Sequence, residues 1–155
     1  MTPIEVLNEK GIHDAIKHLN NIQGHDKETR LLSVFAAKQV QQLMSEDSKK
    51  AVDVSERYAN GLATEEELKN ARAAAYAVYA AACAYTARGY AAYAADAAAR
   101  AVYAAAVDAV YAAAAAVYAA AAAARVLNSK EQPTYWQAIE AKFREIFEEK
   151  SCTQL

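Results

Sequence analysis

The sequence predicts an all-α protein, and three observations support this. Alanine makes up about three in five residues from position 71 to 124, and alanine loses the least side-chain entropy in a helix. The segments on both sides carry apolar residues at helical spacing between recognisable cap residues. No stretch alternates apolar and polar residues as a half-buried strand does. The 155 residues suit one domain, with short helices over 1–62, alanine- and tyrosine-rich helices over 64–127 and a C-terminal helix over 134–150.

The first residues contain signals for the start and the end of a short helix. Thr2 can cap this helix, Pro3 suits its first turn, and Glu5 can complete a capping box with Thr2. Gly11 is expected to end it. A second short helix is expected over residues 12–20, and its apolar face comprises Ile12, Ala15, Ile16 and Leu19. The loop that follows is indicated by Asn20, Asn21 and Gly24.

Two longer helices are expected before position 62. Asp26 is a good N-cap for the first, and the residues from Ser45 to Ser48 predict a polar corner between the two. Asn60 and Gly61 should end the second, because glycine adopts the left-handed conformation that commonly follows a helix. The apolar stripe expected in the first helix comprises Leu31, Leu32, Phe35, Ala36, Val40, Leu43 and Met44. The inner face expected in the second comprises Ala51, Val54, Tyr58 and Ala59.

The alanine-rich segment has a clear start but no clear end. Thr64 and Glu67 form a second capping box, and three consecutive glutamates lie in the first turn, where the helix dipole favours negative charge. From there to Leu127 only Gly89 would interrupt a helix, and one straight helix would be about 90 Å long. We expect a break near Gly89 and a hairpin of long helices on which the short N-terminal helices pack. The alternative is a straight helix that a second copy of the chain buries.

A last helix is expected after a loop from Asn128 to Pro133. Thr134 and Gln137 form a third capping box at its start. Its apolar face comprises Trp136, Ile139, Phe143, Ile146 and Phe147. Because a buried alanine removes only a methyl group from water, large residues of this kind are expected to supply much of the stability.

Tyrosines recur at heptad spacing in the alanine-rich segment. One heptad position is shared by Tyr76, Cys83, Tyr90, Tyr111 and Tyr118, and the position three residues further on by Tyr79 and Tyr93. An alanine surface is smooth and lets helices approach closely, so these rings are expected to act as core spacers that fix the helix register. A second interpretation is a seam through which copies of the chain pair.

The few charged residues of this segment supply a functional hypothesis. Arginines beside tyrosine rings can bind a planar, phosphorylated ligand by stacking and by bidentate hydrogen bonds. A break near Gly89 would bring several of these residues to one turn. The candidate ligand site comprises Arg72, Tyr76, Tyr79, Tyr85, Arg88, Tyr90, Tyr93, Asp96, Arg100 and Tyr103. A simpler interpretation is that Asp96 and Arg100, four residues apart, pair on a solvated face.

Composition argues against several classes of partner. The net charge is −2 and no block of lysine and arginine occurs, whereas a non-specific nucleic-acid binder or a polybasic membrane anchor needs one. The longest uncharged run, residues 109–124, is short and alanine-rich for a membrane span, and the first residues do not form a secretory signal. Cys83 and Cys152 are expected to be free thiols. We therefore expect a cytoplasmic protein without nucleic-acid or membrane partners.

No pattern in the sequence indicates catalysis. His13, His18 and His25 are not spaced as two helical metal ligands are, and no nucleophile-elbow, zinc-protease or phosphate-loop motif occurs. The paired glutamates stand at helix ends, where solvation and the helix dipole account for them. We expect neither an enzyme nor a protein that binds a metal or another cofactor.

Short motifs are distributed from Arg30 to the end of the last helix. They are Arg30-Leu31-Leu32, Glu46-Asp47, Glu56-Arg57-Tyr58-Ala59-Asn60-Gly61, Thr64-Glu65-Glu66-Glu67-Leu68, the alanine run and Phe143-Arg144-Glu145-Ile146-Phe147. This set resembles a recurrent bacterial helical domain that is named as an immunity protein and also forms a module of large planctomycete proteins. The chain departs from that pattern at residues 36–39, where the family is often richer in cysteine and arginine. The likeness implies a component of a conflict system and transfers no catalytic residue.

The sequence therefore predicts a non-catalytic binding protein of the immunity or anti-defence type that neutralises its target by sequestration. The target is a small nucleotide-like signal held among the tyrosines and arginines, or a protein effector. The alternative is a structural or assembly module whose tyrosine seam pairs helices. We expect a homo-oligomer.

Overall fold

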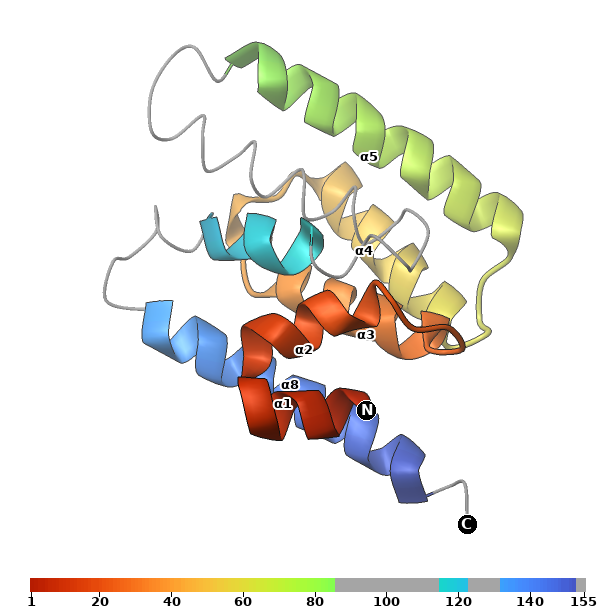
Figure 1. The fold of residues 1–155 in the computed structure, drawn as a ribbon. Helices are drawn as coiled ribbons and strands as arrows, with labels where there is room; N and C mark the ends of the chain where they lie inside the picture. Colours follow the sequence, from red (N-terminus) through yellow and green to blue (C-terminus); the bar gives the residue numbers. More distant parts are fainter. Residues whose placement is uncertain (86–114, 123–131, 153–155) are drawn as a thin grey trace.

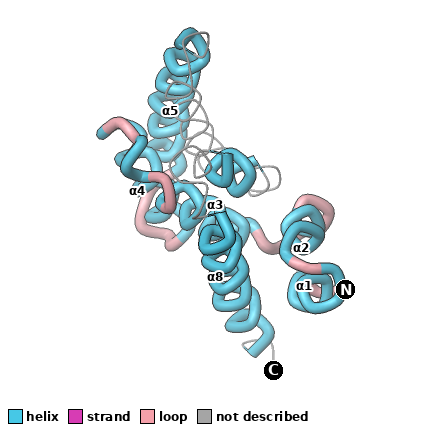
Figure 2. The backbone as a smooth tube through the Cα atoms, turned by 90° about the vertical axis from the view of Figure 1, so that its left-hand side faces the viewer, coloured by secondary structure: helices cyan, strands magenta, loops and turns pink. Residues whose placement is uncertain are grey.

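The computed structural model describes residues 1–85, 115–122 and 132–152, and every regular element in these ranges is a helix. The prediction of an all-α fold is confirmed. The elements are α1 (Pro3–Lys10), α2 (Ile12–Leu19), α3 (Asp26–Lys38), the 3₁₀ helix η1 (Gln41–Leu43), α4 (Glu46–Ala59), α5 (Glu65–Tyr85), a helical segment at 115–122, and α8 (Gln132–Cys152). Each helix contacts the next one in the order α5, α4, α3, α8, α1, α2, which places α3, α4 and α8 between the α1–α2 pair and α5 (Figure 1, Figure 2).

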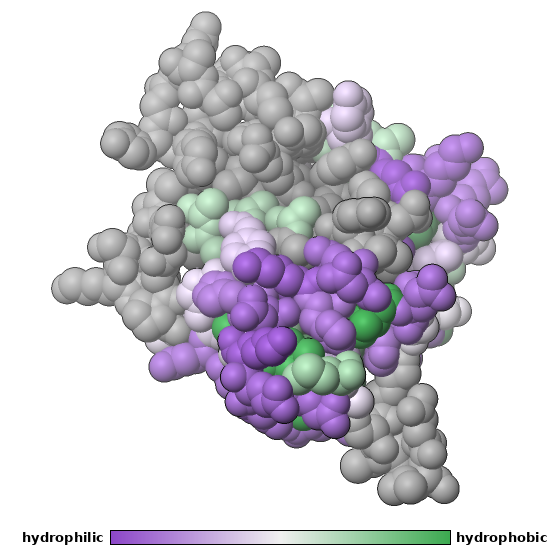
Figure 3. Space-filling view, in the orientation of Figure 1, coloured by the Kyte–Doolittle hydropathy of each residue, from purple (hydrophilic) through white to green (hydrophobic). Residues whose placement is uncertain are grey.

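Helices α1 and α2 form a short antiparallel pair that begins and ends as predicted. The Glu5 N–H donates to Thr2 Oγ1 (3.2 Å), and the Thr2 N–H donates to Glu5 Oε2 (2.7 Å). Gly11 follows α1 with φ +85°, and its N–H donates to the Leu7 carbonyl. In α2 the buried residues are Ala15, Ile16 and Leu19. Hydrophilic side chains cover most of the face that this pair presents in Figure 3, with small hydrophobic areas between them.

Helix α3 is buried over about half of its circumference. Its buried residues are Thr29, Arg30, Leu32, Ser33, Val34, Ala36 and Ala37. The predicted stripe omitted Val34, which is 1% exposed, and it counted no polar residue. Ser33 can be buried because its hydroxyl donates to the Thr29 carbonyl (2.9 Å), and the Arg30 guanidinium lies 5.3 Å from the centre of the Tyr58 ring. Helix α3 thus packs on several sides, as its central place requires.

Both ends of α3 differ from the prediction. Asp26 is the first helical residue and not the N-cap, a position held by His25 without a side-chain cap bond. The helix ends at Lys38 and does not continue to Met44; η1 follows, after the fully buried Val40. No glycine or proline lies in this stretch, so we attribute the end of α3 to the packing of Val40 and not to a local breaker.

Helix α4 turns a different face inward from the one predicted. Ser48, Ala51, Val52 and Ser55 are buried, whereas Val54, Tyr58 and Ala59 are only half-buried. Small hydroxyl residues serve here because their polar atoms are satisfied: the Ser55 hydroxyl donates to the Ala51 carbonyl (2.9 Å). A prediction from hydrophobicity alone therefore assigns the wrong face of α4 to the core, because it leaves out the buried serines.

The end of α4 confirms the predicted glycine stop. Gly61 has φ +72°. Its N–H donates to the Tyr58 carbonyl (3.0 Å), and the Leu62 N–H donates to the Arg57 carbonyl (2.7 Å). These two bonds form a Schellman motif, which satisfies carbonyls left open by the last turn of the helix.

Helix α5 begins at the predicted capping box and packs on α4. The Glu67 N–H donates to Thr64 Oγ1 (3.1 Å), and the Thr64 N–H donates to Glu67 Oε2 (2.7 Å). Ala75 lies in the same hydrophobic core as Val117, although one straight helix would separate these residues by about 63 Å. The alanine-rich segment is therefore not a single straight helix, and the predicted break near Gly89 lies outside the described residues.

Helix α8 begins at Gln132, before the predicted position. Pro133 fits this first turn because the first N–H groups of a helix have no intrahelical acceptor, and Thr134 lies inside the helix instead of capping it. The predicted apolar face is confirmed: Ile139, Phe143, Ile146 and Phe147 are buried and Trp136 is half-buried. Tyr135, which is 6% exposed, was not predicted to be buried.

Candidate binding surfaces

The ligand site predicted from the sequence is described at only a few of its positions. Arg72 is half-buried on α5, and Tyr76 is 56% exposed on the same helix. Tyr79 and Tyr85 also belong to α5. The remaining positions lie outside the described residues, and they are Arg88, Tyr90, Tyr93, Asp96, Arg100 and Tyr103. Tyr76 does not fill a gap in the core, so its predicted role as a core spacer is wrong.

Three aromatic residues from distant parts of the sequence meet at the surface. His13 comes from α2, Tyr118 from the segment at 115–122 and Trp136 from α8. The centre of the His13 ring lies 4.4 Å from that of Trp136 in an edge-on arrangement and 5.9 Å from that of Tyr118, and the Tyr118 and Trp136 rings are 5.7 Å apart. His13 Nδ1 and the Tyr118 hydroxyl are within hydrogen-bond distance (3.1 Å). We call His13, Tyr118 and Trp136 the aromatic surface.

The buried Tyr135 packs against the aromatic surface from the core side. Its ring packs edge-on against Trp136 (5.3 Å between centres), and its hydroxyl donates to the Val117 carbonyl (2.7 Å), which ties α8 to the segment at 115–122. Burial raises the pKa of the Tyr135 hydroxyl well above its usual value. The pKa of Tyr118 is also raised, by partial burial and then by the negative charge of Asp14. Tyrosine hydroxyls are protonated at neutral pH even without such shifts, so both can act as hydrogen-bond donors.

The rings of the aromatic surface touch one another, so they leave no cage between them for a bound cation. Their outer faces are open: Tyr118 is 36% exposed, and His13 is exposed. Tyrosine and tryptophan are enriched among the residues that dominate the energy of protein interfaces. The arrangement therefore suits contact with another macromolecule.

Sequence reasoning did not find the aromatic surface. The sequence patterns place Tyr118 in the tyrosine seam and Trp136 on the apolar face of the last helix, and they assign no role to His13. No spacing within one helix connects the three, because tertiary packing brings them together. The other two histidines make separate contacts: His18 Nε2 donates to the Met1 carbonyl (3.0 Å), and the His25 ring packs on Phe147.

A groove of about 540 Å³ lies between α3, α4 and α8. We call it the lysine groove, and it is lined by Lys27, Glu28, Leu31, Phe35, Lys38, Glu56, Asn60, Lys142, Glu145 and Ile146. Leu31, Phe35 and Ile146 supply its apolar surface. Charged side chains surround them, so the groove offers both hydrophobic and ionic contacts.

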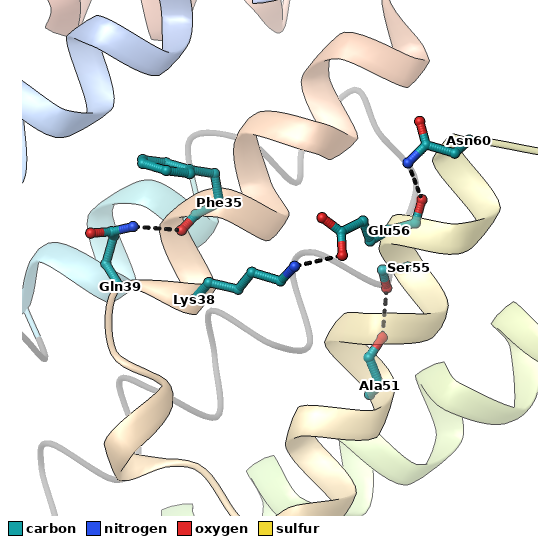
Figure 4. Close-up of polar contacts among 7 residues, drawn as sticks. All are labelled: Phe35, Lys38, Gln39, Ala51, Ser55, Glu56 and Asn60. Atoms are coloured by element: carbon teal, nitrogen blue, oxygen red, sulfur yellow. Dashed lines mark hydrogen bonds and ion pairs between the residues drawn. The ribbon is translucent and has the colours of Figure 1, made fainter.

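Two ion pairs line the lysine groove. Lys38 reaches from α3 to Glu56 on α4, with Nζ 2.5 Å from Oε2 (Figure 4). Lys142 pairs with Glu145 within α8 (2.5 Å), and its Nζ lies 5.8 Å from the centre of the Phe35 ring. Asn60 donates its side-chain N–H to the Glu56 carbonyl, which fixes the end of α4 beside the groove.

Comparisons with protein families, characterised proteins and solved structures find no match to this chain. The resemblance to an immunity-type domain stays a prediction from sequence motifs. Within the described helices, none is both long enough and apolar enough to cross a lipid bilayer.

Proposed function

We propose that this protein is a non-catalytic binding protein of the immunity or anti-defence type and that it neutralises a protein effector by sequestration. The effector docks on the aromatic surface formed by His13, Tyr118 and Trp136. The observation that supports this proposal is that three aromatic rings from α2, the segment at 115–122 and α8 contact one another at the surface of the protein.

The chemistry of these side chains favours a protein target. Each ring offers a large apolar face together with a polar atom, so it can bury area and still satisfy a hydrogen bond. The rings are already packed on Tyr135, which reduces the side-chain entropy that binding would cost. A smaller target, the nucleotide-like signal predicted for the tyrosine and arginine set, stays a prediction, because most of that set lies outside the described residues.

The test uses Trp136, which is the only tryptophan of the chain and therefore reports binding at this surface by its fluorescence. The protein is used to capture candidates from bacterial lysates, and each captured protein is then produced alone and titrated. A true effector should form a complex of fixed stoichiometry, change the Trp136 emission, and leave both partners chemically intact by mass spectrometry.

Matched variants separate the aromatic surface from the rest of the molecule. Tyr118→Ala should weaken the complex by about 10-fold or more, as truncation of an interface hot spot does. Tyr76→Ala, which removes an exposed tyrosine at the same heptad position, should change the affinity by less than about 2-fold. Equal affinities for both variants, or turnover of the captured protein, would contradict the proposal.

A second candidate is an assembly module, and the exposure of Tyr76 favours it. Tyr76 is flanked by the exposed Ala73 and Ala77, so this part of α5 presents a large ring on an alanine surface, as expected for a member of the predicted seam. Analytical ultracentrifugation at micromolar concentration tests this candidate. An oligomer that dissociates in Tyr76→Ala but not in Tyr118→Ala would favour assembly through α5, and a monomer would exclude it.

A further inference from the structure

The lysine groove lies apart from the residues of the aromatic surface, and the proposed function does not use it. We propose that it binds a small organic anion. The apolar or aromatic body of the ligand packs on Leu31, Phe35 and Ile146, and its anionic group, a carboxylate or a phosphate, is held by the ammonium groups of Lys38 and Lys142.

The size and the lining of the groove fit this class of ligand. A volume of about 540 Å³ falls within the range of small-molecule sites. Phe35 on α3 and Ile146 on α8 come from two helices that pack directly on each other, so the apolar floor is already formed in the free protein. A preformed floor lowers the conformational cost of binding.

Charge balance determines how an anion can enter. The lining contains three lysines and three glutamates, and Lys38 and Lys142 are already paired with carboxylates, so a carboxylate must move before a ligand anion can pair fully with either of them. Glu145 is suited to move: its side chain is 57% exposed, and it pairs with Lys142 only three residues away on the same helix. Exposed pairs of this kind contribute little stability, so Glu145 can turn into water at small cost.

Lys142 would stay in place when Glu145 leaves. Its side chain is 28% exposed, and its ammonium group lies over the Phe35 ring, an attraction that does not depend on Glu145. Lys38 is held similarly by Glu56 across the wall between α3 and α4. Lys27 adds a third ammonium group at the start of α3 and forms no ion pair with any residue that the structure describes. An anion therefore meets cations from both sides of the apolar floor.

Isothermal titration calorimetry with 1-naphthyl phosphate tests this proposal. Inorganic phosphate and 1-naphthol represent the anionic and the aromatic part of this probe. Each should bind at least about 10-fold more weakly than 1-naphthyl phosphate. Lys142→Met keeps the apolar stem but removes the charge, so it should weaken binding by about 10-fold. Glu145→Gln removes the competing carboxylate and should strengthen binding by about 2-fold to 5-fold.

The control is Lys49→Met. Lys49 also pairs with a glutamate three residues away, Glu46 (2.7 Å), but it does not line the groove, so its loss should change binding by less than about 2-fold. Equal weakening by Lys49→Met and Lys142→Met would mean that general surface charge attracts the probe, and would overturn the proposal.

Two further results bear on the proposal. Absence of binding at millimolar concentrations of the probe would also overturn it. If circular dichroism shows that Lys142→Met does not fold, the Glu145→Gln variant provides the test. A probe affinity equal to or lower than that of the wild type would then overturn the proposal. Binding should persist in Tyr118→Ala, which separates this test from that of the proposed function.

Discussion

Helices α3 and α5 are built from different kinds of sequence, and α3 buries a larger share of its residues than the described part of α5 does. Helix α3 has 13 residues of mixed type, and seven of them are buried. Helix α5 has 21 residues, mostly alanine and tyrosine after the first turns, and it packs on α4 while Tyr76 stays 56% exposed. Alanine makes α5 the stronger helix former, but large and branched residues determine what lies inside. Helix propensity and a central place in the core are therefore separate properties.

The largest expected effect comes from the core that α8 builds against α3. Phe143 is fully buried, and its ring lies 4.5 Å from that of Phe147. Phe143→Ala should lower the free energy of unfolding by about 3–5 kcal/mol, because it removes buried area and leaves a cavity. Tyr76→Ala on α5 should change it by less than about 0.5 kcal/mol. Urea denaturation followed by Trp136 fluorescence measures both, and comparable losses would refute the contrast between the two regions.

An intermediate effect is expected where α8 meets the segment at 115–122, which belongs to the alanine-rich part of the chain. Tyr135→Phe removes the hydrogen bond to the Val117 carbonyl and should lower the free energy of unfolding by about 1–3 kcal/mol. It also changes the response to alkaline pH. Burial raises the pKa of Tyr135 in the folded state above its unfolded value, so the stabilisation is fully present below about pH 10 and is lost as the pH rises further.

The comparison of wild type with Tyr135→Phe isolates this alkaline loss from the titration of lysines. The difference between their unfolding free energies should be constant from about pH 7 to pH 9 and should shrink above about pH 10. A difference that grows with pH would mean that the folded protein favours the ionised hydroxyl, contrary to its buried environment.

The smallest expected effect is a change in a side-chain pKa at the start of α5, where the capping box lies within one turn of the chain. The backbone N–H and the side chain of Thr64 lower the pKa of Glu67 by hydrogen bonding. Alanine keeps the backbone N–H, which is the larger cause, but lacks the hydroxyl, so Thr64→Ala should move the pKa of Glu67 only part of the way back toward its ordinary value, as measured by NMR titration. Glu46, whose pKa is lowered mainly by its bond with Lys49, is the internal control and should not shift.

Four local signals in the sequence predicted helix ends correctly, whereas the caps expected at Asp26 and Thr134 are not observed. The capping boxes at Thr2 and Thr64 and the glycine stops at Gly11 and Gly61 are all observed. In each case a hydrogen bond or a backbone angle inside the same turn determines the end. The fold class follows from these ends together with the helical periodicity between them.

Features that depend on distant contacts could not be predicted in this way. Helix α3 ends at Lys38 without a local breaker. In α4, hydrogen bonds within the helix allow Ser48 and Ser55 to be buried, but only packing against other helices decides that their face is the inner one. The aromatic surface and the lysine groove each combine residues from three segments. Only packing brings these residues together, so a reading of one helix at a time finds neither site.

Hydrogen exchange of the native protein, read residue by residue, tests most directly the claim that α3 and not the alanine-rich helix is central. We predict that amides in the buried part of α3, such as those of Ser33, Val34 and Ala37, exchange only through global unfolding. Amides of α5 around Tyr76 should exchange through local opening, at least about 100-fold faster. Equal protection of the two helices, or slower exchange in α5, would contradict the account.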